Sequence, residues 1–383
     1  MTIAKLDTPM NGTWRHDDPE TAWTMPSRYF YDPAIFEEEK RRIFYRTWHF
    51  AGHRSELAEP GDYVVTDVFE QSVIVMRGQD GKPRAFHNVC QHRGTRLLKD
   101  RRGRLGPLVT CPYHAWAYGL DGALRSAPRT EGVKGFDRSC FGLKSVRLEE
   151  FAGFLFFNLD AGAAPMAETM AGAEAEIRRY CPDLDDVRLI DEHDYHVAAN
   201  WKVVMDNAIE GYHFPQSGRF HKELTDIIDY DRWDPSAHGA WWSFKGPPRP
   251  GLTHAYGAAL GNGPWQTDWF FNINLWPYNT LYVFPYADFI GTFLMIPAGP
   301  EESLVRCGYY RPERPETPVT KAGRAWFGDK LAPEDIELNV GVQKGLRSFG
   351  YDQGRYVIDP ERPNVSEHLV LHFHGMVHDA LHA

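Results

Sequence analysis

Two short motifs are the most informative part of the sequence: Cys90-Gln91-His92 and Cys111-Pro112-Tyr113-His114. Eighteen residues separate them. Each motif offers one thiolate and one imidazole. A [2Fe-2S] cluster in which two His replace two Cys on one iron needs this division of ligands. Structural zinc also accepts two Cys and two His, but zinc patterns usually keep like ligands together, as C-x2-4-C and H-x3-5-H. The spacing therefore favours an iron–sulfur cluster held by Cys90, His92, Cys111 and His114, with structural zinc as the alternative.

The residues around these ligands are also characteristic. The first motif lies within Asn88-Val89-Cys90-Gln91-His92-Arg93-Gly94, and the second continues into Ala115-Trp116. Gly94 and Pro112 permit tight loops in which backbone N–H groups approach the cluster sulfurs. Both segments resemble the Rieske ferredoxin domain of the ring-hydroxylating oxygenase family. The resemblance implies that the cluster relays single electrons from a more reducing donor to a second site.

A second informative stretch is Asn200-Trp201-Lys202, followed by Asp206-Asn207-Ala208-Ile209-Glu210-Gly211-Tyr212-His213. On a helix, Glu210 and His213 are three apart and share a face with Asp206 and Asn207. Carboxylate, amide and imidazole groups beside bulky aromatic residues indicate a buried site. The alternative is a helix whose polar face meets solvent.

The pattern N-W-K followed by N-x-x-E-x-Y-H resembles the start of the catalytic motif of the same oxygenase family. The resemblance implies that His213 is the first ligand of a mononuclear non-haem iron. It also implies that Glu210 and Asn207 are catalytic residues. Glu210 would be the carboxylate that links this iron to a neighbouring subunit's Rieske cluster.

The second imidazole departs from the family's common spacing, because the position five after His213 is Gly218. The next imidazole is His221, and residues 215–218 let the chain bulge so that it returns toward His213. We therefore predict that His221 is the second iron ligand. The alternatives are His238 and His254.

The family's third iron ligand is a carboxylate from a later helix, and the match places it at Asp335, eight residues before Gln343 of a Q-x-G-L signature. Two imidazoles and one carboxylate occupy one face of iron and leave positions open for oxygen and substrate. From the residues alone, Glu334 and Asp335 equally suit the acidic first turn of a helix, which the helix dipole favours. The family's usual Glu five residues after the Asp is Val340 here.

Short β-rich runs at 63–66, 72–77, 83–86 and 153–159 predict strands of a small antiparallel domain. Apolar positions with a helical period predict a helix at 35–44, and alternation predicts strands at 280–284 and 289–295. The small residues at 161–165 predict a linker. The expected fold class is α+β. We expect residues 1–44 to form an N-terminal arm and a helix that packs on the catalytic domain. We expect residues 45–160 to form a β-rich Rieske [2Fe-2S] domain. By the resemblance, residues 161–383 form a helix-grip catalytic domain with a curved antiparallel sheet.

Composition narrows the class of protein. The net charge of −10, without an extended basic cluster, argues against nucleic acid as a partner. No run of 18 apolar residues and no apolar leader segment occurs, so we expect no membrane span. Five cysteines, an odd and low count, favour a reducing cytoplasm over a disulfide framework. No G-x-G-x-x-G fingerprint follows a strand, which implies that electrons from NAD(P)H arrive through a separate flavin or iron–sulfur reductase.

The resemblance implies the oxygenase component of a Rieske system, with one [2Fe-2S] cluster and one mononuclear Fe(II). It also implies a homotrimer in which one subunit's cluster serves the next subunit's iron. The terminal segments look like the betaine demethylase and hydroxylase branch, so the expected reaction is O2-dependent monooxygenation of a quaternary ammonium compound or betaine. Ring hydroxylation of an aromatic acid is the alternative. A non-catalytic metal-stabilised or electron-transfer protein is the alternative from a different class.

Overall fold

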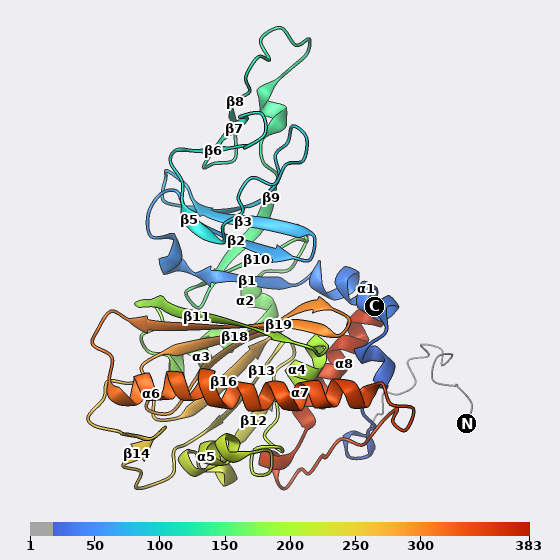
Figure 1. The fold of residues 1–383 in the computed structure, drawn as a ribbon, viewed down its shortest axis with the longest axis vertical. Coiled ribbons are helices and arrows are strands. Elements are labelled where there is room, and N and C mark those ends of the chain that lie inside the picture. The colour runs from blue at the N-terminus through green and yellow to red at the C-terminus, as the bar shows by residue number, and fades with distance from the viewer. Residues whose placement is uncertain (1–17) are drawn as a thin grey trace. The chain divides into compact units, whose positions relative to one another are not determined.

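The computed structural model describes residues 18–383, so the first 17 residues of the N-terminal arm and helix expected at 1–44 lie outside the described residues. The chain forms two compact units (Figure 1). One is Phe44–Ala171, and in the other residues 18–43 join Gly172–Ala383. No helix in the described range is both long enough and apolar enough to cross a bilayer.

The first unit is built on a seven-stranded antiparallel sheet in the order β1-β10-β9-β4-β3-β2-β5, with a three-stranded sheet in the order β6-β7-β8. Its strands are β1 (Trp48–His53), β2 (Asp62–Val68), β3 (Gln71–Arg77), β4 (Pro83–His87), β5 (Arg102–Arg104), β6 (Leu108–Thr110), β7 (Ala117–Gly119), β8 (Leu124–Ser126), β9 (Ser145–Phe151) and β10 (Phe154–Asn158). The strands predicted at 63–66, 72–77, 83–86 and 153–159 are confirmed as β2, β3, β4 and β10. Cys90 and Cys111 belong to the hydrophobic core of this unit, together with Ile74 and Tyr118.

This unit continues past the expected boundary at residue 160 and ends at Ala171. The guanidinium of Arg147 on β9 donates to the carbonyl oxygen of Ala163. The carboxylate of Glu149 accepts a hydrogen bond from the backbone N–H of Met166 at 2.8 Å. These bonds hold the small-residue segment and the short helix α2 (Met166–Thr169) against the sheet, because β9 supplies both side chains.

The second unit is built on a curled, seven-stranded antiparallel sheet in the order β11-β19-β18-β17-β16-β13-β12. Its strands are β11 (Val187–Val197), β12 (Asp234–Ala237), β13 (Trp241–Gly246), β16 (Phe270–Leu275), β17 (Asn279–Val283), β18 (Ile290–Gly299) and β19 (Glu302–Pro312), and a separate hairpin pairs β14 (His254–Ala255) with β15 (Ala258–Ala259). The strands predicted at 280–284 and 289–295 are confirmed as β17 and β18.

The helices of the second unit are α1 (Pro33–Glu39), α3 (Ala173–Tyr180), α4 (Trp201–Ala208), α5 (Arg219–Ile227), α6 (Pro318–Trp326), α7 (Ala332–Leu346) and α8 (His368–His382), with π-helical turns at Lys40–Phe44 and Phe327–Leu331. Helices α6 and α7 run across one face of the sheet (Figure 1). The helix predicted at 35–44 is confirmed as α1 and the turn that follows it. Short 3-10 turns lie at Pro19–Thr21, Ser27–Phe30, Arg54–Leu57, Arg138–Phe141, Tyr230–Arg232 and Pro363–Val365.

A buried ion pair fastens α1 to the second unit. The carboxylate of Glu39 lies 2.6 Å from the ammonium of Lys202 on α4, and both side chains are fully buried. The same carboxylate accepts from the indole N–H of Trp201 at 2.9 Å. Each buried charge depends on its partner, because an unpaired charge in the interior is strongly destabilising. The segment before the first unit therefore folds as part of the second.

The centre of the sheet presents a row of side chains to one face. Phe244 lies opposite Asn272, Asn272 opposite Tyr282, and Tyr282 opposite Gly291 across four neighbouring strands. Residues opposite one another in adjacent strands point to the same side of a sheet. A Cβ at Gly291 would overlap the ring of Tyr282, so the glycine makes room for that ring. This face forms the floor of the cavity described below.

Candidate metal centres and substrate cavity

Two loops with the same hydrogen-bond pattern carry the four candidate cluster ligands. In the first, the N–H of Cys90 donates to the carbonyl of Thr95 at 2.8 Å, and the N–H of Gly94 donates back to Cys90 at 3.1 Å. In the second, Cys111 repeats both bonds with the residues five and four further on, at 2.8 and 3.1 Å. The fourth residue after each cysteine has a positive φ, 72° at Gly94 and 55° at Ala115. The tight turns expected from Gly94 therefore occur in both loops.

The loops bury the sulfur atoms and expose the imidazoles. Cys90 and Cys111 are 2% and 3% exposed, whereas His92 and His114 are exposed. The ring centroids of the two histidines lie 4.7 Å apart. Burial opposes ionisation of Cys111, but the backbone N–H groups of Tyr113 and His114 lower the pKa of its thiol. Two buried sulfurs beside amide donors and two exposed imidazoles fit a cluster with one His-ligated iron at the surface.

The second candidate centre brings together His213, His221 and Asp335. One ligand atom from each lies within 4.8 Å of the others. Oδ1 of Asp335 is 2.9 Å from Nε2 of His221 and 3.8 Å from Nε2 of His213. The three come from the loop after α4, from α5 and from α7. Two imidazole nitrogens and a carboxylate oxygen form the donor set that non-haem iron(II) oxygenases use.

Carboxylates hold the far side of both imidazoles. Glu210 hydrogen-bonds Nδ1 of His213 and accepts from its backbone N–H at 3.2 Å. Nε2 of His213, on the other side of the ring, faces Asp335. The amide nitrogen of Asn207 approaches the same Nε2 at 3.4 Å. The structure therefore places Glu210 behind His213 and Asn207 at the edge of the centre.

Glu334 is a functional candidate that the sequence reasoning missed. Its carboxylate accepts from Nδ1 of His221 at 2.9 Å and from the backbone N–H groups of Phe220 and His221 at 3.1 and 3.3 Å. It therefore both caps the first turn of α5 and orients His221, which lies on that helix. Burial lowers the pKa of His221, but hydrogen bonds to Asp335 and Glu334 outweigh burial and raise it. The position accordingly attracts positive charge.

The alternative histidines lie elsewhere. His238 stacks on Trp241, with ring centroids 4.0 Å apart. His254 is exposed on the small hairpin and contacts the hydroxyl of Thr253 at 3.0 Å. Among residues 18–383, the group around Asp335 is the one set of three such side chains close enough to share an ion.

Two cavities meet at the second centre. The smaller one, of about 70 Å³, touches all three candidate iron ligands. Its other lining residues are mostly aromatic and apolar: Asn207, Ala208, Phe214, Leu224, Phe244, Phe270, Asn272, Tyr282, Phe284, Phe293, Phe327 and Leu331. The rings contact one another, as between Tyr282 and Phe327 at 5.1 Å. This cavity offers a mostly aromatic site beside the candidate iron.

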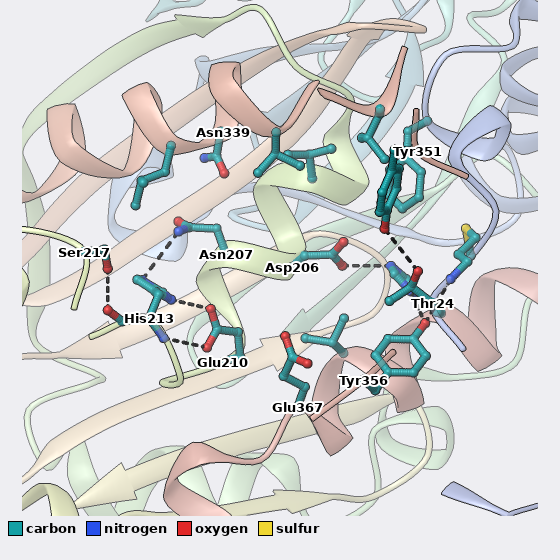
Figure 2. A pocket seen from close by; sticks show the side chains of 18 residues that line it. Thr24, Asp206, Asn207, Glu210, His213, Ser217, Asn339, Tyr351, Tyr356 and Glu367 are labelled. Carbon is teal, nitrogen blue, oxygen red and sulfur yellow. Dashed lines mark hydrogen bonds and ion pairs between the residues drawn. The ribbon is translucent and has the colours of Figure 1, made fainter. Parts of the chain in front are cut away.

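The larger cavity, of about 300 Å³, lies on the side of Glu210 (Figure 2). The carboxylates of Asp206, Glu210 and Glu367 all line it. Nε2 of His374 lies 2.8 Å from Asp206, and the hydroxyl of Tyr356 lies 2.6 Å from the other ring nitrogen, Nδ1. Burial, reinforced by the charges of Glu210 and Asp206, raises the pKa of Glu367 to about 7.

Family models match both units. The Rieske [2Fe-2S] domain matches residues 47–137, and the ring hydroxylating alpha subunit (catalytic domain) matches residues 184–383. The chain is 36% identical to the carnitine monooxygenase oxygenase subunit of Escherichia coli (strain K12), over 94% of this chain and 94% of that protein. It is 27% identical to the chloroplastic choline monooxygenase of Atriplex hortensis, over 94% of this chain and 79% of that protein.

A solved structure also resembles the chain along nearly its whole length. It is that of a quaternary ammonium Rieske monooxygenase, with a TM-score of 0.86 and 32% identity, covering 95% of this chain and 96% of that one. The chain therefore belongs to the ring-hydroxylating alpha-subunit family of Rieske non-haem iron oxygenases, whose members carry a Rieske [2Fe-2S] cluster and a mononuclear iron.

Proposed function

We propose that this oxygenase acts on a quaternary ammonium compound, by monooxygenation that hydroxylates or oxidatively demethylates it. The observation that carries the proposal is the aromatic cavity that touches His213, His221 and Asp335. The face of an aromatic ring attracts a cationic ammonium group. The names of the relatives from Escherichia coli and Atriplex hortensis, which refer to carnitine and choline, support the same class of substrate.

We assign the cluster to Cys90, His92, Cys111 and His114, and the mononuclear iron to His213, His221 and Asp335. When bound, the iron supplies activation of O2 and the cluster supplies the electrons that this activation consumes. The chain's own contribution is orientation and exclusion of water. Carboxylates at Nδ1 of both imidazoles turn the two Nε2 atoms toward Asp335, as outer-shell partners of metal ligands commonly do.

We further propose a homotrimer in which Glu210 links the iron of one subunit to the cluster of its neighbour. Glu210 suits this role because it contacts His213 and also lines the larger cavity. The solved quaternary ammonium monooxygenase, which resembles this chain, is described as giving insight into inter-subunit electron transfer. The electron donor would be a separate flavin or iron–sulfur reductase that oxidises NAD(P)H, and the compartment would be the cytoplasm. Ring hydroxylation of an aromatic acid is not proposed, because the relatives' names refer to carnitine and choline.

Turnover with a coupled Rieske reductase and 18O2 tests the proposal. Choline and carnitine are the first substrates, and a benzoate series is the comparison. We expect 18O-labelled product from at least one quaternary ammonium compound and none from Asp335→Ala, which should keep its cluster. Labelled product from the benzoate series alone would contradict the proposal.

A further inference from the structure

The small aromatic cavity contains one amide side chain of the sheet, that of Asn272, which the candidate iron ligands do not use. Asn272 lies on β16, opposite Phe244 and Tyr282, and is 8% exposed. It lines the same cavity as His213 and Asp335. Its neighbours in the cavity wall are mostly rings and aliphatic chains, so its amide is out of place unless it has a partner.

A chain of hydrogen bonds fixes which way this amide points. The hydroxyl of Thr280 donates to Oδ1 of Asn274 at 2.6 Å. Nδ2 of Asn274 then donates to Oδ1 of Asn272 at 2.8 Å. Asn274 and Thr280 are 0% and 1% exposed, so neither can turn to water instead. The carbonyl oxygen of Asn272 therefore already accepts a hydrogen bond from the protein, from Asn274.

The other end of the Asn272 amide is left without an acceptor. Its NH2 group donates to no protein atom in the part of the chain that the structure describes. Asn272 lines the cavity, so this donor is available to a ligand there. The arrangement fits a donor prepared for an oxygen atom that enters the cavity with a ligand.

The charge of the cavity wall limits which chemical group of the ligand can carry that oxygen atom. No Lys or Arg is among the residues that line the cavity, and all of these lie within the described range. A carboxylate or a hydroxyl entering here would meet neutral donors, while the aromatic rings would receive a cationic end. The two kinds of contact suit a molecule that is cationic at one end and carries oxygen at the other.

From these contacts we infer that Asn272, positioned by Asn274 and Thr280, binds the oxygen-bearing end of the substrate and so selects among quaternary ammonium compounds. This inference rests on the proposed function, because it takes the cationic end from that proposal. The shared ligand chemistry is an oxygen acceptor, either a hydroxyl, as in choline, or a carboxylate, as in carnitine.

Calorimetric binding to the oxidised holoenzyme tests the inference with three probes. Choline carries a hydroxyl, carnitine carries a carboxylate and a hydroxyl, and tetramethylammonium carries no oxygen. Asn272→Leu should weaken choline about fivefold, and carnitine about thirtyfold if its carboxylate is the group bound, because hydrogen bonds to charged groups are stronger. Tetramethylammonium should bind within about twofold of wild type, which also shows that the cavity is intact.

Two further variants refine the test. One separates the positioning of Asn272 from its direct contact with the ligand, and the other separates binding of a hydroxyl from binding of a carboxylate. Thr280→Val cannot touch the ligand directly but frees Asn274, so it should weaken the oxygen-bearing probes in the same order as Asn272→Leu and by less. Asn272→Asp should repel carnitine while it keeps choline, because only carnitine carries a negative charge.

The outcomes distinguish the role of Asn272 from the proposed substrate class. Equal losses for all three probes, or no loss for any, would overturn the role of Asn272 and leave the proposed substrate class standing. A wild-type enzyme that binds none of the three would overturn the proposed function, and this inference with it.

Discussion

Replacing Glu334 should loosen the mononuclear iron without disturbing the cluster. Its carboxylate makes three contacts, to Nδ1 of His221 at 2.9 Å and to the backbone N–H groups of Phe220 and His221 at 3.1 and 3.3 Å. Loss of such an outer-shell partner typically costs about 10–100-fold in metal affinity. Glu334→Gln keeps a carbonyl acceptor, so we expect a loss near tenfold. Glu334→Ala removes every contact, so we expect about a hundredfold.

The alanine variant should also lose stability, since the same carboxylate caps α5. Removal of a helix cap costs about 1 kcal/mol. Retention of iron during titration with a ferrous chelator measures the first effect, and thermal unfolding measures the second. The cluster spectrum serves as an internal standard, because Cys90 and Cys111 lie in the other unit.

Glu337→Gln is the matched control for this experiment. Glu337 is an exposed residue on the same helix, three positions further on, and it should leave iron binding unchanged. If Glu334→Ala retains iron as firmly as Glu337→Gln does, then the orientation of His221 does not depend on Glu334. That result would refute a role for Glu334 in building the centre.

Three other substitutions test the framework around the site. Lys202→Met leaves the carboxylate of Glu39 buried and unpaired, so we expect a loss of about 3–5 kcal/mol in the free energy of unfolding, measured by denaturant titration; a loss below about 1 kcal/mol would contradict the buried ion pair. Gly291→Ala forces a methyl group into the ring of Tyr282 and should cost about 1–3 kcal/mol by the same method, whereas a neutral effect would show that the ring can move aside. The pKa of Glu367 is raised from 4.5 to about 7, so this carboxyl favours folding below pH 4.5, and its contribution is lost as the pH rises through 7. Glu367→Gln should therefore melt higher, relative to wild type, at pH 8 than at pH 5, and an equal difference at both values would contradict the raised pKa.

Local signals account for what the sequence predicted well. The cluster loops are short, and each one contains its Cys, its His and the residue that turns the chain. A motif of this kind needs no knowledge of distant contacts. The strands β2, β3 and β17 were predictable for the same reason, because alternation and turn residues act within a few positions.

Distant contacts account for what was missed. Only the family resemblance singles out Asp335, because a Glu-Asp pair at a helix start also suits the helix dipole. Nothing local distinguishes Glu334, whose partner His221 lies on another helix. Asn272 gave no signal either, since its orientation comes from Asn274 and from a residue on the next strand. The end of the first unit at Ala171 likewise depends on contacts back to β9 rather than on composition.

The most direct test of the central claim is metal analysis combined with low-temperature EPR of the dithionite-reduced protein, for wild type and Asp335→Ala. We expect a Rieske signal in both proteins, with about three irons per chain in wild type and about two in the variant, the counts for one binuclear centre with and without a mononuclear one. Zinc in place of iron, or a variant that keeps the third iron, would contradict it.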